Sequence, residues 1–284
     1  MPDFPIIDTH LHVWDPKQIR YPWLDGVPFL NKPYLLADYN KACGPVKVEK
    51  MVFLQCECDP AQYKDEARWV TGLARQDPRI QGIVPFAPLE KGEGARRELA
   101  DLAKNKLIKG IRRITQFESD PAFCLRKDFV RGMQMLAEFH FSFDICIKGD
   151  EQFRNTIQLV RQCPKVNFIL DHIGKPFIKE RILEPWETCL KQFADLPNTW
   201  CKMSGLVTEA DFEKWTNDDL QPYIAAVMEA FGWDRVVFGG DWPVAFQACE
   251  YPRWVETLEW ALKGATPAQL RKLFHDNAVA FYRL

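Results

Sequence analysis

Short apolar runs alternate with longer amphipathic stretches along the whole chain of 284 residues. The runs are rich in Val, Ile and Phe, and several are apolar at consecutive positions. Such runs are typical of strands that crossover helices bury on both faces. Eight strands are predicted in this way, at residues 5–13, 49–57, 80–88, 108–115, 141–148, 166–173, 199–205 and 235–241.

Helical patterns lie between the predicted strands, with apolar residues three or four positions apart. Two of these stretches end within two residues of a proline, which disfavours helical geometry in the residue before it. Thr266 is a suitable N-cap for a last helix that begins at Pro267. The other predicted helices are 64–76, 95–104, 128–139, 151–163, 184–196, 218–231 and 254–262.

The order of the elements predicts the fold class. Eight strands, each followed by a helix, indicate a parallel sheet, and eight is the number that closes a (β/α)8 TIM barrel. An open doubly wound sheet is the alternative, but no GxGxxG or GxxxxGK[ST] motif follows any strand, so no dinucleotide or P-loop site is indicated. We therefore predict a single α/β domain over residues 1–284. The Pro-rich segment 21–33 is too long for a plain turn and follows the first strand, where barrels carry functional loops.

Composition narrows the class of protein. The chain is 47% hydrophobic and 27% charged, which excludes disordered and collagen-like architectures. With 37 basic and 39 acidic residues the net charge is −2, so no nucleic-acid or anionic-membrane partner is indicated. There is no secretory signal and no apolar run of ~18 residues. Nine scattered cysteines lack disulfide spacing, so we expect reduced thiols in a cytoplasmic protein. No feature of the sequence indicates the oligomeric state.

Histidines stand at the end of the first predicted strand. The strand closes with the sequence Asp-Thr-His-Leu-His, and alternation places Asp8, His10 and His12 on one face. A parallel barrel assembles its chemistry at the carboxyl ends of the strands. Two imidazoles on one side of such a strand end can converge on one metal ion or one substrate.

Two further strand ends carry ionisable groups. His172 leaves the sixth strand and is followed by Gly and Pro, which indicates a loop site rather than core packing. Asp241 ends the otherwise apolar eighth strand, where a carboxylate has to be paired or desolvated, so it is a candidate general base or metal ligand. The chain has five histidines, and the other two, His140 and His275, are interpreted as structural or surface groups.

Other polar and aromatic residues are predicted around the same rim. Arg112 and Arg113 are neighbours on the fourth strand, so only one should face the barrel mouth while the other pairs on the helix side. Basic groups at the mouth suit an anionic or carbonyl-rich small molecule. Tryptophans near strand exits either stack on a ring or pack loops over the barrel. The candidate substrate-binding residues are Arg112, Arg113, Lys202, Glu57, Trp14 and Trp242, with Trp23 near them.

Four motifs resemble those of a known family. IIDTHLHVWDP, GIRR, ILDHIGKP and VVFGGDWPV occur in this order and are together similar to the amidohydrolase superfamily. The resemblance is to the branch with L-fuconolactonase- and L-rhamnonolactonase-type sugar lactonases and with pyrone-dicarboxylate and sulfomuconolactone hydrolases, and it spans nearly the whole chain. It implies a (β/α)8 barrel that hydrolyses small lactones. It also implies that His10 and His12 form the first-strand HxH, that His172 is the sixth-strand histidine, and that Asp241 acts on water.

The fifth strand departs from the family pattern. Metal-dependent members usually carry a histidine at its end, whereas residues 143–148 read FDICIK. The usual metal cage is therefore incomplete, and related lactonases include members that need no metal. One Zn²⁺ held by His10, His12, Asp241 and Glu57 is compatible with the residues, since zinc accepts mixed nitrogen and carboxylate ligands. A metal-independent site is the alternative.

The leading hypothesis is the opening of a small sugar lactone to its hydroxy acid. Asp241 is expected to take a proton from the water that attacks the lactone carbonyl. The groups expected to stabilise the oxyanion or to orient the water are His10, His12, His172 and one of Arg112 or Lys202.

Three alternatives stay open at this point. The first is a hydrolase of a muconolactone or a pyrone-dicarboxylate lactone in aromatic degradation. The second is a metal-dependent decarboxylase of the same superfamily, which the missing fifth-strand histidine disfavours. The third is a barrel that has become a small-molecule binding module, although the expected proton-transfer residues are all present.

Overall fold

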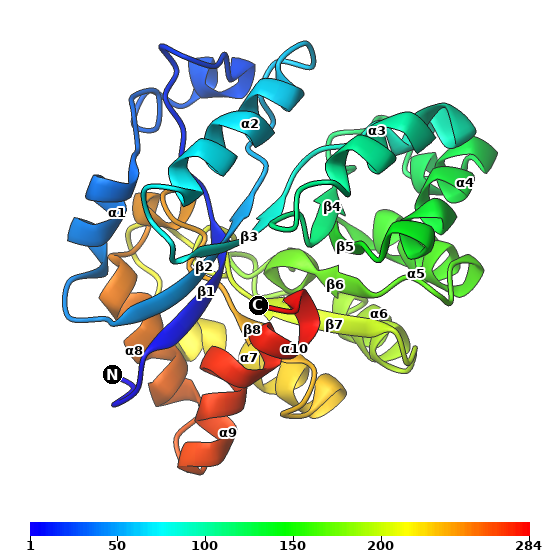
Figure 1. Cartoon of the computed structure of the whole chain (residues 1–284). Helices are drawn as coiled ribbons and strands as arrows, with labels where there is room; N and C mark the ends of the chain where they lie inside the picture. The colour runs from blue at the N-terminus through cyan, green and yellow to red at the C-terminus, as the bar shows by residue number, and fades with distance from the viewer.

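All eight predicted strands are present in the computed structural model, which describes residues 1–284. Most of them are shorter than predicted because their carboxyl-terminal residues leave the sheet and form the loops at the barrel mouth (Figure 1). The strands are β1 (Ile6–Leu11), β2 (Val48–Leu54), β3 (Ile80–Val84), β4 (Gly110–Arg112), β5 (Ser142–Ile145), β6 (Phe168–Leu170), β7 (Thr199–Met203) and β8 (Val236–Phe238).

Helices connect the strands in the expected alternation. The helix between β1 and β2, α1 (Leu36–Cys43), is not among the predicted ones because it is short and buries only Tyr39 and Cys43. Thr266 caps the last helical segment as predicted, its hydroxyl accepting from the Gln269 amide. The others are α2 (Tyr63–Ala74), α3 (Arg96–Leu102), α4 (Lys127–Met135), α5 (Asp150–Gln162), α6 (Trp186–Ala194), α7 (Asn217–Phe231), α8 (Tyr251–Ala261), α9 (Pro267–Arg271) and α10 (Asn277–Tyr282).

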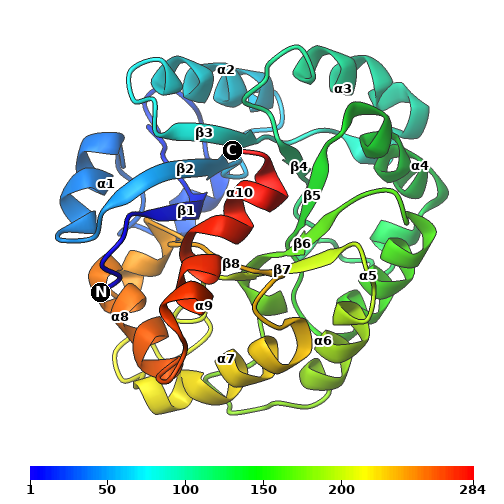
Figure 2. The same cartoon turned by 60° about the horizontal axis from the view of Figure 1, so that its bottom comes forward.

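The strands form a ring that the helices surround (Figure 2). Neighbours pair in parallel in the orders β1-β2-β3 and β4-β5-β6-β7-β8. Single parallel bridges join the two sheets, between Ile83 and Ile108 at one seam and between Leu11 and Trp242 at the other. The architecture is the predicted (β/α)8 barrel, with two seams looser than the rest. No helix has the length and apolar character that crossing a membrane requires.

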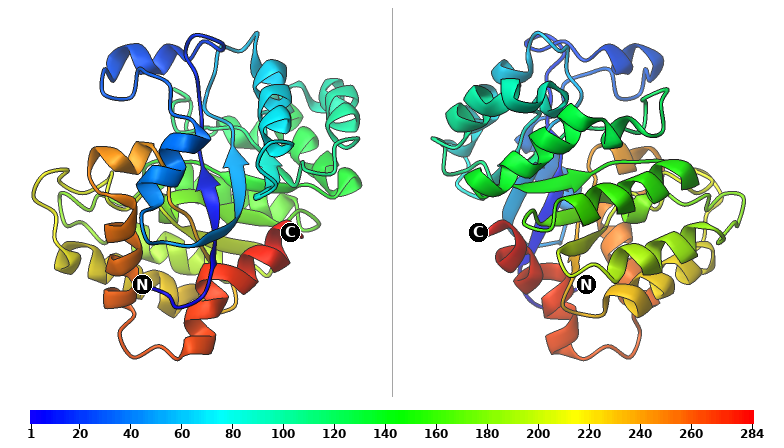
Figure 3. Two further views of the ribbon diagram at one scale, coloured as in Figure 1. Left: turned by 60° about the vertical axis from the view of Figure 1, so that its left-hand side comes forward. Right: turned by 90° about the vertical axis from the view of Figure 1, so that its right-hand side faces the viewer.

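The two ends of the barrel differ in character. At its amino-terminal end, where α10 lies, a small buried apolar cluster includes Val52, Val84, Val237 and Tyr282 of that helix. The segment α9–α10 crosses that end (Figure 2), while the long loop after β1 lies at the opposite end (Figure 3). The ionisable residues predicted at strand ends therefore gather at the end that the terminal helices leave open.

Candidate active site

A cavity of about 230 Å³ opens at the carboxyl ends of the strands. It is lined by residues from the loops after seven of the eight strands, and aromatic side chains form part of its wall. Among the residues predicted from the sequence, those that line it are His12, Trp14, Trp23, Glu57, Arg112, His172 and Asp241.

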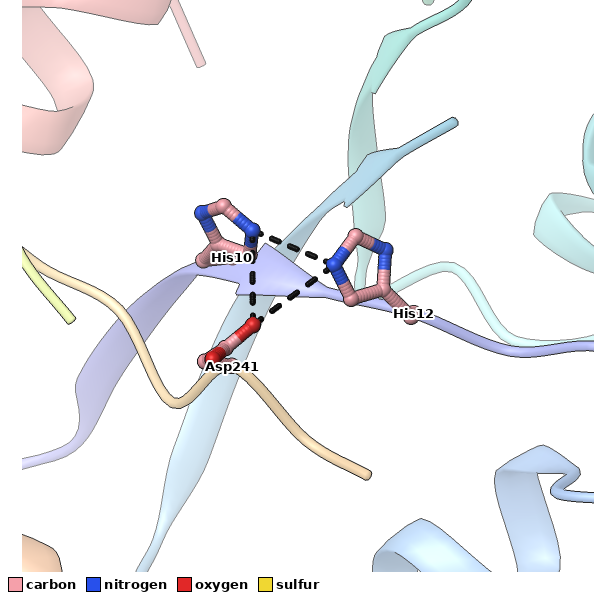
Figure 4. Close-up of side chains that lie close together, drawn as sticks. All are labelled: His10, His12 and Asp241. Atoms are coloured by element: carbon pink, nitrogen blue, oxygen red, sulfur yellow. Dashed lines mark hydrogen bonds and ion pairs between the residues drawn. The ribbon is translucent and has the colours of Figure 1, made fainter. Parts of the chain in front are cut away.

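His10, His12 and Asp241 lie close together (Figure 4), and the last two line this cavity. The two Nε2 atoms of the histidines are 3.1 Å apart, and Asp241 Oδ1 lies 3.6 and 3.7 Å from them. The backbone of Asp241 is tied to β1, since its amide donates to the His10 carbonyl at 2.8 Å. Gly239 permits this approach: a Cβ there would lie 2.7 Å from the His10 Cβ.

Asp8 does not lie on the same face of β1 as His10 and His12. The prediction that side chains alternate regularly along this strand is therefore wrong. The register of β1 against β2 slips between Asp8 and Leu11, and such a bulge re-aims the side chains around it. The Asp8 carboxylate instead accepts hydrogen bonds from Tyr39 of α1 at 2.8 Å and Tyr251 of α8 at 2.9 Å. It anchors the strand to the surrounding helices while His10 stays inside the barrel.

The protonation states of this cluster follow from burial. Desolvation lowers the pKa of His12 to about 3 and the pKa of His10 and His172 well below the ordinary value, with nearby cations adding to the effect. These imidazoles are therefore neutral at pH 7. Burial raises the pKa of Asp241 to about 7, against the opposing attraction of Lys175 and Arg112. A carboxylate with a pKa near neutrality is suited to general-base catalysis.

The cluster fits a single zinc ion. His12 Nδ1 donates to the Leu54 carbonyl at 2.9 Å, so its Nε2 carries a lone pair. Arg112, always a donor, contacts His10 Nε2 at 3.3 Å, so that nitrogen is the unprotonated one, and a zinc ion would replace Arg112 as the partner of its lone pair. Ligands ~2.0–2.1 Å from one zinc ion lie roughly 3.3 Å from one another in a tetrahedron, close to the separations found here. Glu57, which was also predicted as a ligand, is not in the cluster: the Gln55 amide donates to its carboxylate at 2.6 Å.

Asp171 is a site residue that the sequence did not single out, although it precedes His172 in the ILDHIGKP motif. It is fully buried, with Lys202 Nζ at 2.9 Å, Arg112 Nη1 at 3.2 Å and His10 Nδ1 at 3.5 Å. Although burial acts to raise it, the pKa of Asp171 lies below its ordinary value because Lys202 and Arg112 are so close. His10, Asp171 and His172 also lie within ligand distance of one another, but two cations already balance this carboxylate. A metal ion would be a third positive charge here, and Lys202 and Arg112 would repel it.

The two neighbouring arginines point in opposite directions, as alternation predicts. Arg112 faces the cavity and the site, whereas Arg113 forms ion pairs with Glu118 at 2.5 Å and Glu90 at 3.4 Å. The guanidinium of Arg113 also lies over the Phe123 ring. Arg113 therefore does not line the cavity for which it was predicted.

Two other predicted binding residues lie outside the cavity. Lys202 has no solvent exposure and places its ammonium group between Asp144, at 2.7 Å, and Asp171. It neutralises carboxylates inside the barrel instead of meeting a substrate. Trp242 is also buried, packing edge-on against Tyr34 and Tyr39. Neither residue lines the cavity, because position at a strand end does not reveal which neighbours cover a side chain.

The tryptophans of the first long loop do reach the cavity. Trp14 and Trp23 pack edge to face with ring centroids 5.5 Å apart, and both contribute to the cavity wall. The indole of Trp23 donates to the Cys56 carbonyl at 2.8 Å, which ties this loop to the end of β2. Loop residues that were not among the predicted ones complete the lining, among them Gln116, Lys175 and Thr208.

Known proteins are similar to this chain over nearly its whole length. A family model described as "Amidohydrolase" matches residues 7–284. An uncharacterized protein from Sinorhizobium fredii is 30% identical, with 100% of both chains covered. An L-fucono-1,5-lactonase from Burkholderia multivorans is 29% identical over 98% of this chain and 96% of its own length. The crystal structure of an amidohydrolase from Burkholderia multivorans with bound zinc superposes with a TM-score of 0.89 at 28% identity, covering 99% of this chain and 100% of that one.

Proposed function

Because the chain belongs to the amidohydrolase family, we propose that it opens a small sugar lactone to the corresponding hydroxy acid. The observation that carries the proposal is the site itself: Asp241 lies at the cavity floor beside His10 and His12, with Arg112 next to them. A base, neutral imidazoles and a fixed cation around one point are the groups that ester hydrolysis by water requires. Named relatives of nearly full length are lactonases, which are carboxylic-ester hydrolases.

Asp241 is assigned the proton transfers. Its carboxylate takes a proton from a water molecule as the water oxygen bonds to the lactone carbonyl carbon. When the tetrahedral intermediate collapses, the ring C–O bond breaks and the same side chain returns the proton to the departing ring oxygen. One carboxylate thus serves as base and then as acid. Its pKa of about 7 suits both the uptake of the proton from water and its return to the ring oxygen.

Arg112 and His172 are assigned to the developing oxyanion and to the water. Arg112 lines the cavity, where Asp171 and the Gln55 carbonyl hold its guanidinium group in place, so a fixed positive charge faces the substrate. His172 is oriented by Ser204, whose hydroxyl lies 3.0 Å from its Nδ1 atom. Zinc held by His10, His12 and Asp241 would act as a Lewis acid on the carbonyl or the water.

The charges around the cavity favour a neutral, hydroxylated ring over a dicarboxylate. Its cationic side chains are Arg112 and Lys175, and Asp171 already balances the first of them. Glu57 and Asp241 contribute carboxylates to the same lining. A dianionic pyrone would need cations in excess, whereas sugar hydroxyls are served by carboxylate and amide groups beside aromatic walls. Among lactones we therefore propose the aldonolactones.

A panel of lactones tests the function. L-fucono-1,5-lactone, other aldonolactones, a muconolactone and 2-pyrone-4,6-dicarboxylate are mixed with the protein, and acid release is followed with a pH indicator. We expect rapid acid release from at least one aldonolactone and little from the two aromatic-degradation lactones. No release from any of the lactones would refute the proposal. Preference for the pyrone would refute the proposed substrate class.

Zinc binding is expected to depend on His12 and not on Glu57. After equilibration with zinc and removal of the excess, the wild-type protein should retain one ion per chain. His12→Ala should lose it because one of three ligands is gone. Glu57→Gln is the matched control, since this residue lines the same cavity without joining the cluster. Metal analysis of the three proteins gives the result, and equal zinc contents would contradict the assigned ligands.

A further inference from the structure

The last helix brings a phenol into the barrel interior. Tyr282, two residues before the chain end, is fully buried, and α10 carries it across the amino-terminal end of the barrel (Figure 2). Its ring belongs to a small buried apolar cluster that also contains Val84 and Ile169. Its hydroxyl donates to Asp144 Oδ2 of β5 at 2.6 Å. A polar group from the terminal helix is therefore bonded to the inner face of the strands.

Asp144 connects this phenol to the site. The same Oδ2 atom accepts from Lys202 Nζ at 2.7 Å, and Lys202 contacts Asp171 Oδ1 at 2.9 Å on its other side. Asp171 in turn contacts Arg112 at 3.2 Å and His10 at 3.5 Å. An unbroken series of buried polar contacts thus runs from the terminal helix to two residues of the active site.

The charges in this series balance. Asp144 and Asp171 are matched by Lys202 and Arg112, and Tyr282 is the neutral donor at the end. Asp144 Oδ1 has no partner, so the phenol supplies one of only two contacts to that carboxylate. A buried carboxylate that loses a donor is costly. Without the phenol, Lys202 is drawn toward Asp144 and away from Asp171, which loosens Asp171.

We propose that Tyr282 is a positioning residue for the active site. Through Asp144 it fixes Lys202, and Lys202 fixes the carboxylate of Asp171 that orients Arg112 and His10. The terminal helix then has a role beyond closing the apolar end of the barrel. The inference rests on the proposed function only where activity is the readout.

Tyr282→Phe tests the inference because it removes the hydroxyl and keeps the ring. We expect kcat on the aldonolactone to fall about tenfold, the loss typical of an outer partner of a site residue, with KM nearly unchanged. The ¹⁵N resonances of the His10 imidazole should also move. With five histidines in the chain, the spectrum is assignable, and His140 and His275 serve as internal references away from the site.

Phe281→Leu is the matched control. Phe281 is buried in the same cluster of the same helix but carries no polar group, so its substitution should lower stability without moving the His10 resonances. A Tyr282→Phe protein with wild-type kcat and an unmoved His10 signal would overturn the inference. If that variant does not fold, Asp144→Asn is used instead: its amide oxygen can still accept from the phenol, but the charge that holds Lys202 is gone, so the His10 resonances have to move. Inactivity of the wild type on every lactone would refute the proposed function, while the spectra would still decide the role of Tyr282.

Discussion

Asp241→Asn is expected to lower kcat for lactone hydrolysis about 1000-fold, within the range that general acid–base catalysis contributes. Asparagine keeps the size of the side chain and leaves the backbone bond to the His10 carbonyl intact. It has no carboxylate to accept a proton from water or to return one to the ring oxygen. Steady-state kinetics on an aldonolactone, with thermal unfolding to verify the fold, measure the effect.

Two controls separate proton transfer from other roles of this residue. Glu57→Gln removes another carboxylate from the same cavity wall and should change KM more than kcat, because Glu57 is expected to hold substrate hydroxyls. Zinc content is measured in parallel, and the Asp241→Asn protein is assayed at saturating zinc so that lost metal does not explain lost activity. Turnover by this variant at the wild-type rate would rule out Asp241 as the base.

Arg112→Lys is expected to lower kcat about 100-fold, the loss associated with one preorganised oxyanion donor. Lysine keeps the positive charge near Asp171, so the buried carboxylate stays paired. It does not reproduce the planar fork that reaches His10, Asp171 and the Gln55 carbonyl together. The expected loss is therefore in turnover more than in folding, and kcat and the unfolding temperature are measured together.

The adjacent arginine is a matched control for this experiment. Arg113→Lys makes the same chemical change one residue along the chain, where the side chain pairs with Glu90 and Glu118 outside the cavity. It should leave kcat unchanged and lower the unfolding temperature slightly. Equal losses of activity in the two variants would show that Arg112 acts through stability instead of catalysis.

Residues placed by topology were predictable from the sequence. His12, His172 and Asp241 follow apolar runs, and the carboxyl ends of parallel strands meet at one end of a barrel. Their convergence needed no knowledge of side-chain packing. The opposite directions of Arg112 and Arg113 likewise follow from the period of two along a strand.

Residues placed by local irregularity or by packing were not predictable. The bulge in β1 turns Asp8 toward α1 and α8, and no periodic pattern reveals an extra residue in a ladder. Lys202 and Trp242 stand at strand ends like the residues that line the cavity, yet carboxylates surround the first and tyrosines cover the second. Which neighbours cover a side chain depends on segments that are distant in the chain.

The sequence by itself determined the order of strands and helices and the convergence of four candidate residues at one end of the barrel: His10, His12, His172 and Asp241. These features depend on the spacing of apolar residues and on which polar residues follow each apolar run, and both are local properties of the chain. Only the tertiary structure decided that Asp171 balances Arg112 and Lys202, and that Tyr282 bonds to Asp144 from 138 residues away. The physical reason is that charge pairing acts over a few ångströms in space and is independent of distance along the chain.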